Sequence, residues 1–74
     1  MTTQKTQDLT AAVLFHRKRI ADYETYLETL GPEADKAQAE NDYNKLNDLE
    51  DITEATSQRI KENEEIIREL NDEL

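Results

Sequence analysis

The chain has 74 residues, of which 36% are charged and 35% are hydrophobic, and it contains no cysteine. A chain this short forms a single domain, residues 1–74, that neither disulfides nor thiolate-bound metal can stabilise. Its net charge of −9 argues against direct binding to nucleic acid or an anionic membrane, because phosphate contacts need clustered Lys and Arg. Its polar start and the lack of a long apolar run predict a cytoplasmic protein.

In the first part of the chain, seven positions follow one another at alternating steps of four and three residues. We call such a row of positions, which lies along one side of a helix, a seam. The seven positions are Leu9, Val13, His16, Ile20, Tyr23, Leu27 and Leu30, and all but His16 are apolar. This spacing predicts a helix over about residues 6–30, with one narrow apolar stripe of the coiled-coil kind. A Thr or Asp between Thr3 and Asp8 is expected to cap its free backbone N–H groups.

The only glycine and the only proline of the chain are adjacent, at Gly31 and Pro32. Glycine tolerates the left-handed conformation that closes a helix, and proline suits the first turn of the next one. We therefore expect the chain to turn at residues 31–32.

A second helix is predicted over about residues 33–73. Its seam is longer and more polar: Ala39, Asp42, Leu46, Leu49, Thr53, Thr56, Ile60, Asn63, Ile67, Leu70 and Leu74. The expected fold is all-α, an antiparallel two-helix hairpin. An alternative is a monomeric three-helix bundle, in which Asp51 and Glu54 form a capping box that starts a third helix.

With a turn at residues 31–32, the first helix ends opposite residues 56–60, because it is much shorter than the second. The last turns of the second helix then lack a partner within the chain. Several apolar side chains, among them Tyr26, also lie beside the seam rather than on it. Both features predict a homodimer, a four-helix bundle, whose apolar anchors or interface residues are Leu14, Phe15, Tyr43, Ile52, Ile66, Ile67, Leu70 and Leu74.

The charge is uneven along the chain: residues 1–30 carry four acids and four bases, whereas residues 31–74 carry fourteen acids and five bases. Such an excess of acid favours a basic partner surface, although it can also serve only to keep a helical protein soluble. The expected partner-binding residues form an acidic face on the second helix: Glu50, Asp51, Glu54, Glu62, Glu65, Glu69 and Asp72.

Catalytic and ligand-binding patterns are lacking. The sole histidine, His16, has no companion ligand for a metal and is expected to bond a nearby side chain such as Asn47. The basic cluster His16–Arg19 is expected to pair with the second helix, for example Arg17 with Glu50. No Gly-rich phosphate loop or Ser–His pair is suggested. We therefore expect no enzyme activity, no cofactor and no metal.

The short hairpin that doubles into a bundle resembles the small RNA-binding hairpins that control plasmid copy number, but its outer face carries acids where theirs carries bases. In size, charge and lack of cysteine the chain is similar to small acidic phage proteins that block host nucleic-acid enzymes. This resemblance implies an inhibitor that acts as a DNA mimic on a basic, nucleic-acid-binding surface. The alternative is a structural coiled-coil assembly factor or adaptor subunit. Binding by mimicry should weaken steeply with salt, whereas assembly through an apolar seam should not.

Overall fold

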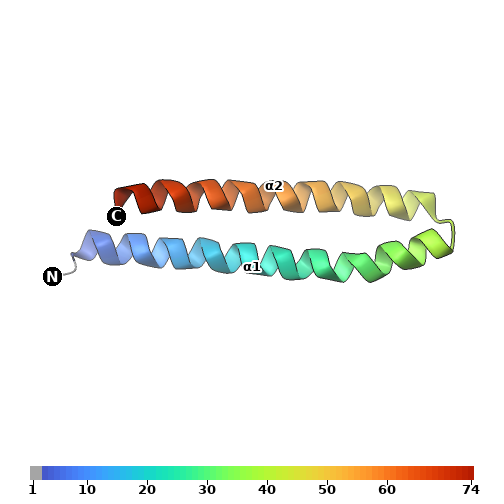
Figure 1. Cartoon of the computed structure of the whole chain (residues 1–74), viewed down its shortest axis with the longest axis horizontal. Coiled ribbons are helices and arrows are strands. Elements are labelled where there is room, and N and C mark those ends of the chain that lie inside the picture. The colour runs from blue at the N-terminus through green and yellow to red at the C-terminus, as the bar shows by residue number, and fades with distance from the viewer. Residues whose placement is uncertain (1–2) are drawn as a thin grey trace.

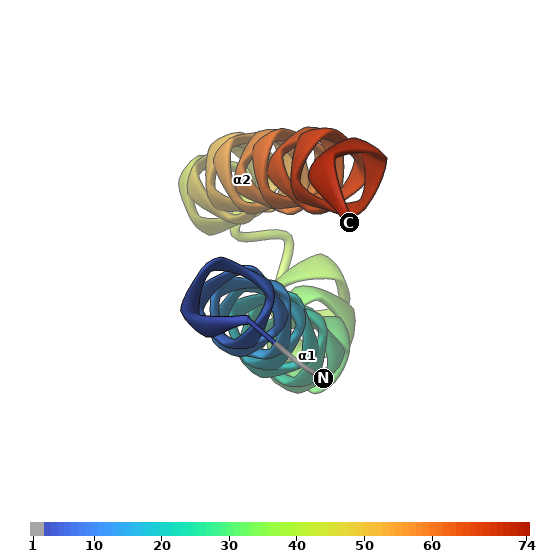
Figure 2. The ribbon, with the colours of Figure 1, turned by 90° about the vertical axis from the view of Figure 1, so that its left-hand side faces the viewer.

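The computed structural model describes residues 3–74, which form two antiparallel helices joined by a short turn (Figure 1). Helix α1 spans Gln4–Ala39 and helix α2 spans Tyr43–Glu73. The hairpin measures 60 × 15 × 11 Å. Seen from its end, it consists of the two helices packed side by side (Figure 2). The predicted all-helical hairpin is therefore confirmed, and residues 3–74 contain no strand.

The predicted position of the turn, at residues 31–32, is wrong. Helix α1 continues through Gly31 and Pro32, and the chain turns at residues 40–42. Asn41 adopts a left-handed conformation, with φ of 56°. Its N–H donates to the carbonyl of Gln38 at 3.1 Å, and the N–H of Asp42 donates to the carbonyl of Ala37 at 2.8 Å. These two bonds form the Schellman motif, which satisfies carbonyls left free at a helix end.

Both helices begin at a side-chain cap. The Asp42 carboxylate accepts a hydrogen bond from the backbone N–H of Lys45 at 3.1 Å, so helix α2 starts as soon as the Schellman motif ends. The Thr3 hydroxyl accepts from the backbone N–H of Thr6 at 3.2 Å, as expected for a cap in this part of the chain. Each cap satisfies one backbone donor that the helix leaves unpaired.

The stripe of α1 explains why the helix does not stop at Gly31. After Leu30 the spacing of four and three continues without a shift to Ala34 and Ala37, and Ala37 is buried. Pro32 lies on the exposed side of the helix. Because proline has no backbone N–H, the carbonyl of Glu28 loses its helical hydrogen bond, but on this side water can bond to it instead. Gly31 has an ordinary helical conformation, and a Cβ added there would meet no atom within 4 Å. The packing of the stripe therefore overrides the local preference for a turn.

The turn preceding Pro32 shows two further departures from a regular helix. The Thr29 hydroxyl donates to the carbonyl of Tyr26 at 2.6 Å, and the Thr25 hydroxyl donates to the carbonyl of Ala21 at 3.0 Å. Side-chain bonds of this kind and a proline within a helix both bend it. Helix α1 curves towards α2 as it approaches the turn (Figure 1).

A single seam between the helices forms the core. All seven positions predicted for α1 lie in it, and so do the positions of α2 from Leu46 onward, apart from Thr53 and Leu74. Ala39 and Asp42, which were predicted to belong to the seam, are exposed at the turn. The most deeply buried residues are Val13, Leu30, Ala37, Leu49, Thr56 and Asn63.

Helix α2 is continuous through Thr53 and Thr56, so the alternative of a third helix starting at residues 51–54 is wrong. Because the turn lies at residues 40–42, the two helices have similar lengths, 36 and 31 residues. The last turns of α2 therefore pack on the first turns of α1, and Ile67 and Leu70 are half-buried there. The expectation that these residues need a second copy for their burial is wrong.

Candidate partner-binding surfaces

The division of charge follows the helices. Helix α1 contains six acids and five bases, helix α2 contains ten acids and four bases, and the turn adds Glu40 and Asp42. Helix α2 and the turn thus carry most of the net charge of −9. The second helix therefore carries the excess of acids, as expected from the sequence, although the turn lies about ten residues closer to the C-terminus than predicted.

The seven acids predicted to form the acidic face are exposed, and they extend along most of α2: Glu50, Asp51, Glu54, Glu62, Glu65, Glu69 and Asp72. Within residues 3–74 the single ion pair joins Arg68 to Glu65 at 3.9 Å, one helical turn apart, and both side chains are about 70% exposed. Such exposed pairs neutralise little charge. The acidic face therefore points to solvent, and Lys61 and Arg68, which lie in one row with Glu54 at steps of seven residues, offset only part of its charge.

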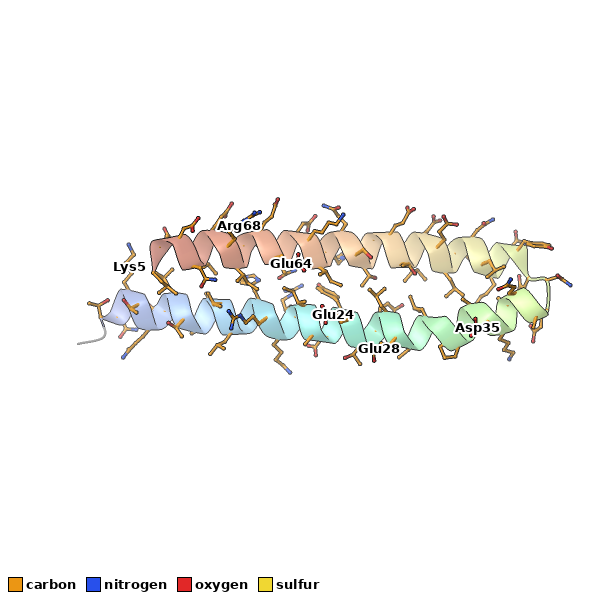
Figure 3. All side chains as sticks on the ribbon, viewed as in Figure 1. Lys5, Glu24, Glu28, Asp35, Glu64 and Arg68 are labelled. Atoms are coloured by element: carbon orange, nitrogen blue, oxygen red, sulfur yellow. The ribbon has the colours of Figure 1, made fainter. Side chains whose placement is uncertain are left out.

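Sequence reasoning missed that α1 adds acids beside this surface. Glu24, Glu28 and Asp35 of α1 point to the same side of the hairpin as Glu64 of α2 (Figure 3). All four are exposed. Their positions relative to the α1 stripe could have placed them beside the seam, but the sequence prediction considered only the acids of the second helix.

Six of the eight predicted apolar anchors are exposed, as is Tyr26: Leu14, Phe15, Tyr43, Ile52, Ile66 and Leu74. The exposed fraction is largest for Tyr43, at 68%, and smallest for Ile52 and Ile66, at 37% each. Ile67 and Leu70 belong instead to the seam, where each is half-buried against α1.

His16 and Asn63 form a polar layer within the seam. The His16 Nδ1 lies 2.7 Å from the Asn63 Oδ1, and the Asn63 Nδ2 donates to the carbonyl of Arg59 at 2.7 Å. Because Asn63 uses its amide N–H on that carbonyl, its oxygen is left to accept from a protonated Nδ1 of His16. Asn47, the predicted partner of His16, is exposed near the turn. The histidine thus has a structural hydrogen bond, as expected, but with a different asparagine.

The basic cluster of α1 does not make the predicted pair between Arg17 and Glu50, since within residues 3–74 no ion pair involves either residue. Arg19 instead donates to the Tyr23 hydroxyl at 2.8 Å and lies 5.7 Å from the centre of the Phe15 ring. That hydrogen bond lowers the pKa of Tyr23; desolvation opposes the shift, and Arg59 of the facing helix reinforces it. Arg19 of α1 thus contacts Tyr23 directly, and Arg59 of α2 lies near enough to the same hydroxyl to affect its pKa.

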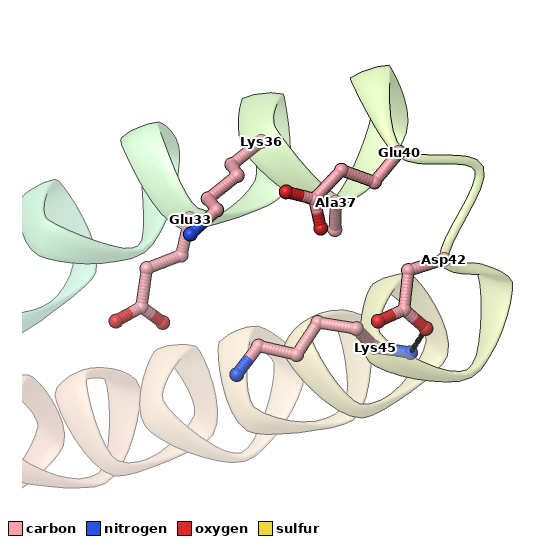
Figure 4. A pocket seen from close by; sticks show the side chains of 6 residues that line it. All are labelled: Glu33, Lys36, Ala37, Glu40, Asp42 and Lys45. Carbon is pink, nitrogen blue, oxygen red and sulfur yellow. Dashed lines mark hydrogen bonds between the residues drawn. The ribbon is translucent and has the colours of Figure 1, made fainter.

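A shallow depression of about 300 Å³ lies beside the turn (Figure 4). Its lining is mostly charged and comes from both helices and the turn: Glu33, Lys36, Ala37, Glu40, Asp42 and Lys45. It is open to solvent and holds acids and bases in mixture, so it offers no focused site for a small ligand. Within residues 3–74 no three His, Cys, Asp or Glu side chains are grouped so as to hold a metal ion.

Comparison with protein-family models, curated proteins and solved structures finds no match to this chain. Neither α1 nor α2 has an apolar stretch long enough to cross a membrane. Function must therefore be inferred from the surfaces themselves: the acidic face of α2 and the exposed apolar side chains.

Proposed function

We propose that this chain is a non-enzymatic interaction protein whose acidic face binds a basic surface of a partner protein, of the kind that otherwise holds nucleic acid. The observation that carries the proposal is the exposed acidic face of α2, in which only Glu65 has an ion-pair partner among residues 3–74. A surface with a strong excess of one charge attracts a surface of the opposite sign and speeds association.

The spacing of the acids supports mimicry of a nucleic acid. Helix α2 has 31 residues and is therefore about 46 Å long. Its ten acids form two groups, separated between Glu54 and Glu62, and average one for about every 5 Å of helix axis, against about 3.4 Å for each phosphate of one DNA strand. A helix braced along one side also loses less conformational freedom on binding than a flexible acidic tail would.

We further propose that the chain acts in the cytoplasm as a homodimer, with two hairpins packed as a four-helix bundle. The exposed apolar residues beside the seam support this assembly, because a small hairpin with one narrow seam buries little of its surface alone. A dimer would present two acidic faces on one rigid body. The second candidate function, a structural adaptor or assembly factor, also relies on these apolar residues but gives the acids only a solubilising role.

Competition with nucleic acid distinguishes the two functions. Partners are captured on the immobilised chain at low salt, purified, and assayed for binding to duplex DNA or RNA with increasing amounts of free chain. Mimicry predicts competition and a steep loss of chain binding with added salt. Simultaneous binding of the chain and the nucleic acid to every captured partner would contradict mimicry and favour the adaptor.

A matched pair of variants tests where the charge acts. Replacing Glu54→Gln, Glu65→Gln and Asp72→Asn removes three acids from the acidic face of α2. Replacing Glu24→Gln, Glu28→Gln and Asp35→Asn removes the same three charges from α1. The α2 variant should lower the slope of log affinity against log salt by about three, if each acid replaces one phosphate, and the α1 variant should change it less. Equal effects would show that only net charge matters.

A further inference from the structure

On one side of the hairpin, the two rows of residues that flank the seam contain both basic and apolar side chains. On α1 the residues that flank the stripe at steps of seven are Lys5, Ala12, Arg19, Tyr26 and Glu33. On α2 the equivalent row is Lys45, Ile52, Arg59, Ile66 and Glu73. Because seven residues make almost two full turns of a helix, each row lies along one side of its helix.

Two observations place both rows on the same side of the hairpin. Arg19, the middle member of the α1 row, donates a hydrogen bond to Tyr23, and Arg59, the middle member of the α2 row, also lowers the pKa of that tyrosine. Glu33 and Lys45, near the turn, line the same depression (Figure 4). Tyr26 and Ile52 lie one step of seven from the arginines, between these two points, and are therefore neighbours. Ala12 and Ile66 are related in the same way on the other side of the arginines.

We call this surface the arginine face: Ala12, Arg19, Tyr26, Ile52, Arg59 and Ile66. Its centre is a pair of like charges, and two apolar pairs flank it. Within residues 3–74 no carboxylate lies within ion-pair distance of Arg19 or Arg59. Repulsion between neighbouring cations is unfavourable unless an anion relieves it. Asp22 and Glu62, each three residues after one of these arginines, lie on the same flank of their helices, one turn away.

We propose that the arginine face packs against the arginine face of a second copy. This inference rests on the proposed homodimer and specifies its interface. In this packing, the apolar pairs of one copy, Ala12 with Ile66 and Tyr26 with Ile52, contact apolar pairs of the other. The arginines of each copy, Arg19 and Arg59, lie within reach of Glu62 and Asp22 of the other. The charged ends of the two faces also match, whichever two-fold axis in the plane of the interface relates the copies. An axis parallel to the helices sets Lys5 against Glu73 and Lys45 against Glu33 of the other copy. An axis perpendicular to the helices sets Lys5 against Glu33 and Lys45 against Glu73.

Charge selects this side for contact between copies. The two rows, with Glu40 at the end of the α1 row, contain four bases and three acids, in a chain whose net charge is −9. Two copies that met through the acidic face of α2 would repel each other, whereas the arginine faces attract the flanking carboxylates. The arrangement turns most of the acidic face of α2 outward in both copies, where the proposed partner can reach it.

Charge reversal tests the interface and leaves every seam residue in place, although R19E removes the hydrogen bond from Arg19 to Tyr23. The double variant R19E R59E makes the centre wholly acidic, and D22K E62K makes it wholly basic, so each variant repels itself while the two complement each other. Sedimentation equilibrium should show the wild type moving from the 8.6 kDa monomer towards twice that mass as concentration rises. Each variant alone should dimerise at least about tenfold more weakly, and an equimolar mixture should recover the dimer, because like charges brought together cost several kcal/mol.

A second pair of variants tests the apolar part of the face. I52Q I66Q should weaken the dimer, and L14Q, on the opposite flank of α1, should not; circular dichroism confirms that the helices remain. The inference is overturned if the wild type stays monomeric, if R19E R59E dimerises as well as the wild type, or if the mixture fails to associate. A monomer that still competes with nucleic acid would overturn this interface and leave the proposed function of the acidic face standing.

Discussion

Residues 28–35 and residues 38–43 of this chain both carry signals for a turn, and the chain turns only at the second. The first segment has Gly31 and Pro32, the two residue types with the lowest helix propensities. The second has Asn41 in a left-handed conformation and Asp42 as a helix cap. The difference shows that a helix ends where its packed stripe ends, provided that suitable capping residues are present there.

The free energy that Gly31 and Pro32 cost within a helix is comparable to the free energy gained by burying the rest of the seam. Packing can therefore override the local preference for a turn at these residues. Gly and Pro together disfavour a helix by about 4 kcal/mol relative to two alanines. A turn at residues 31–32 would leave Ile60, Ile67 and Leu70 without a facing helix. Each such side chain contributes about 1.5–3 kcal/mol when fully buried, and these three are half-buried in the hairpin. Extending α1 also buries Ala37.

The largest effect is expected from Pro32→Ala. If Pro32 lies within a continuous helix, alanine restores the bond to the Glu28 carbonyl and should raise the free energy of unfolding by about 2–3 kcal/mol. Urea denaturation at one fixed protein concentration measures the change. If Pro32 instead began a second helix, the substitution would have little effect, because proline is favoured at a first helical turn.

A smaller loss is expected from Asn41→Ala. Alanine pays more than asparagine for a left-handed backbone, so the variant should be less stable by about 1 kcal/mol, whereas Asn41→Gly should match or exceed the wild type. The comparison between the two variants in thermal unfolding is the measurement. A gain of stability in Asn41→Ala would place Asn41 within a regular helix, where alanine is favoured over asparagine, and would contradict a turn at residues 40–42.

The smallest effect is expected from Gly31→Ala. The added methyl group would meet no atom within 4 Å, and alanine restricts the unfolded chain, so the variant should gain about 0.5–1 kcal/mol. Its sign is the informative result. If Gly31 closed a helix in the left-handed conformation, its replacement by alanine would make the protein less stable. A decrease in stability would therefore indicate a turn at residues 31–32.

Much of the fold could be predicted from the sequence, because the apolar spacing fixes which side of each helix is buried. The α1 seam from Leu9 to Leu30 and most of the α2 seam are confirmed. The position of the turn was missed although Ala34 and Ala37 continue the spacing, since alanines mark a stripe weakly and Gly-Pro marks a break strongly. Asn41 followed by Asp42 was the second available signal.

The surfaces were predictable only in part. The acids of α2 are exposed as expected, because charged side chains at positions away from a seam have no reason to be buried. The convergence of Arg19 and Arg59 on Tyr23 was missed. It depends on which residues of the two helices face each other, and moving the turn by ten residues changes every such pair. His16 accordingly meets Asn63 rather than Asn47.

The most direct test of the account is to identify by NMR which asparagine lies against His16. With a turn at residues 40–42, nuclear Overhauser contacts should join the His16 ring to the side-chain amide protons of Asn63, whose Oδ1 lies 2.7 Å from the His16 Nδ1. A mixed sample of labelled and unlabelled chains, with isotope filtering, should show that these contacts arise within one chain. Contacts from His16 to Asn47 instead would restore the turn at Gly31 and Pro32 and contradict both the pairing of the helices and the arginine face built on it.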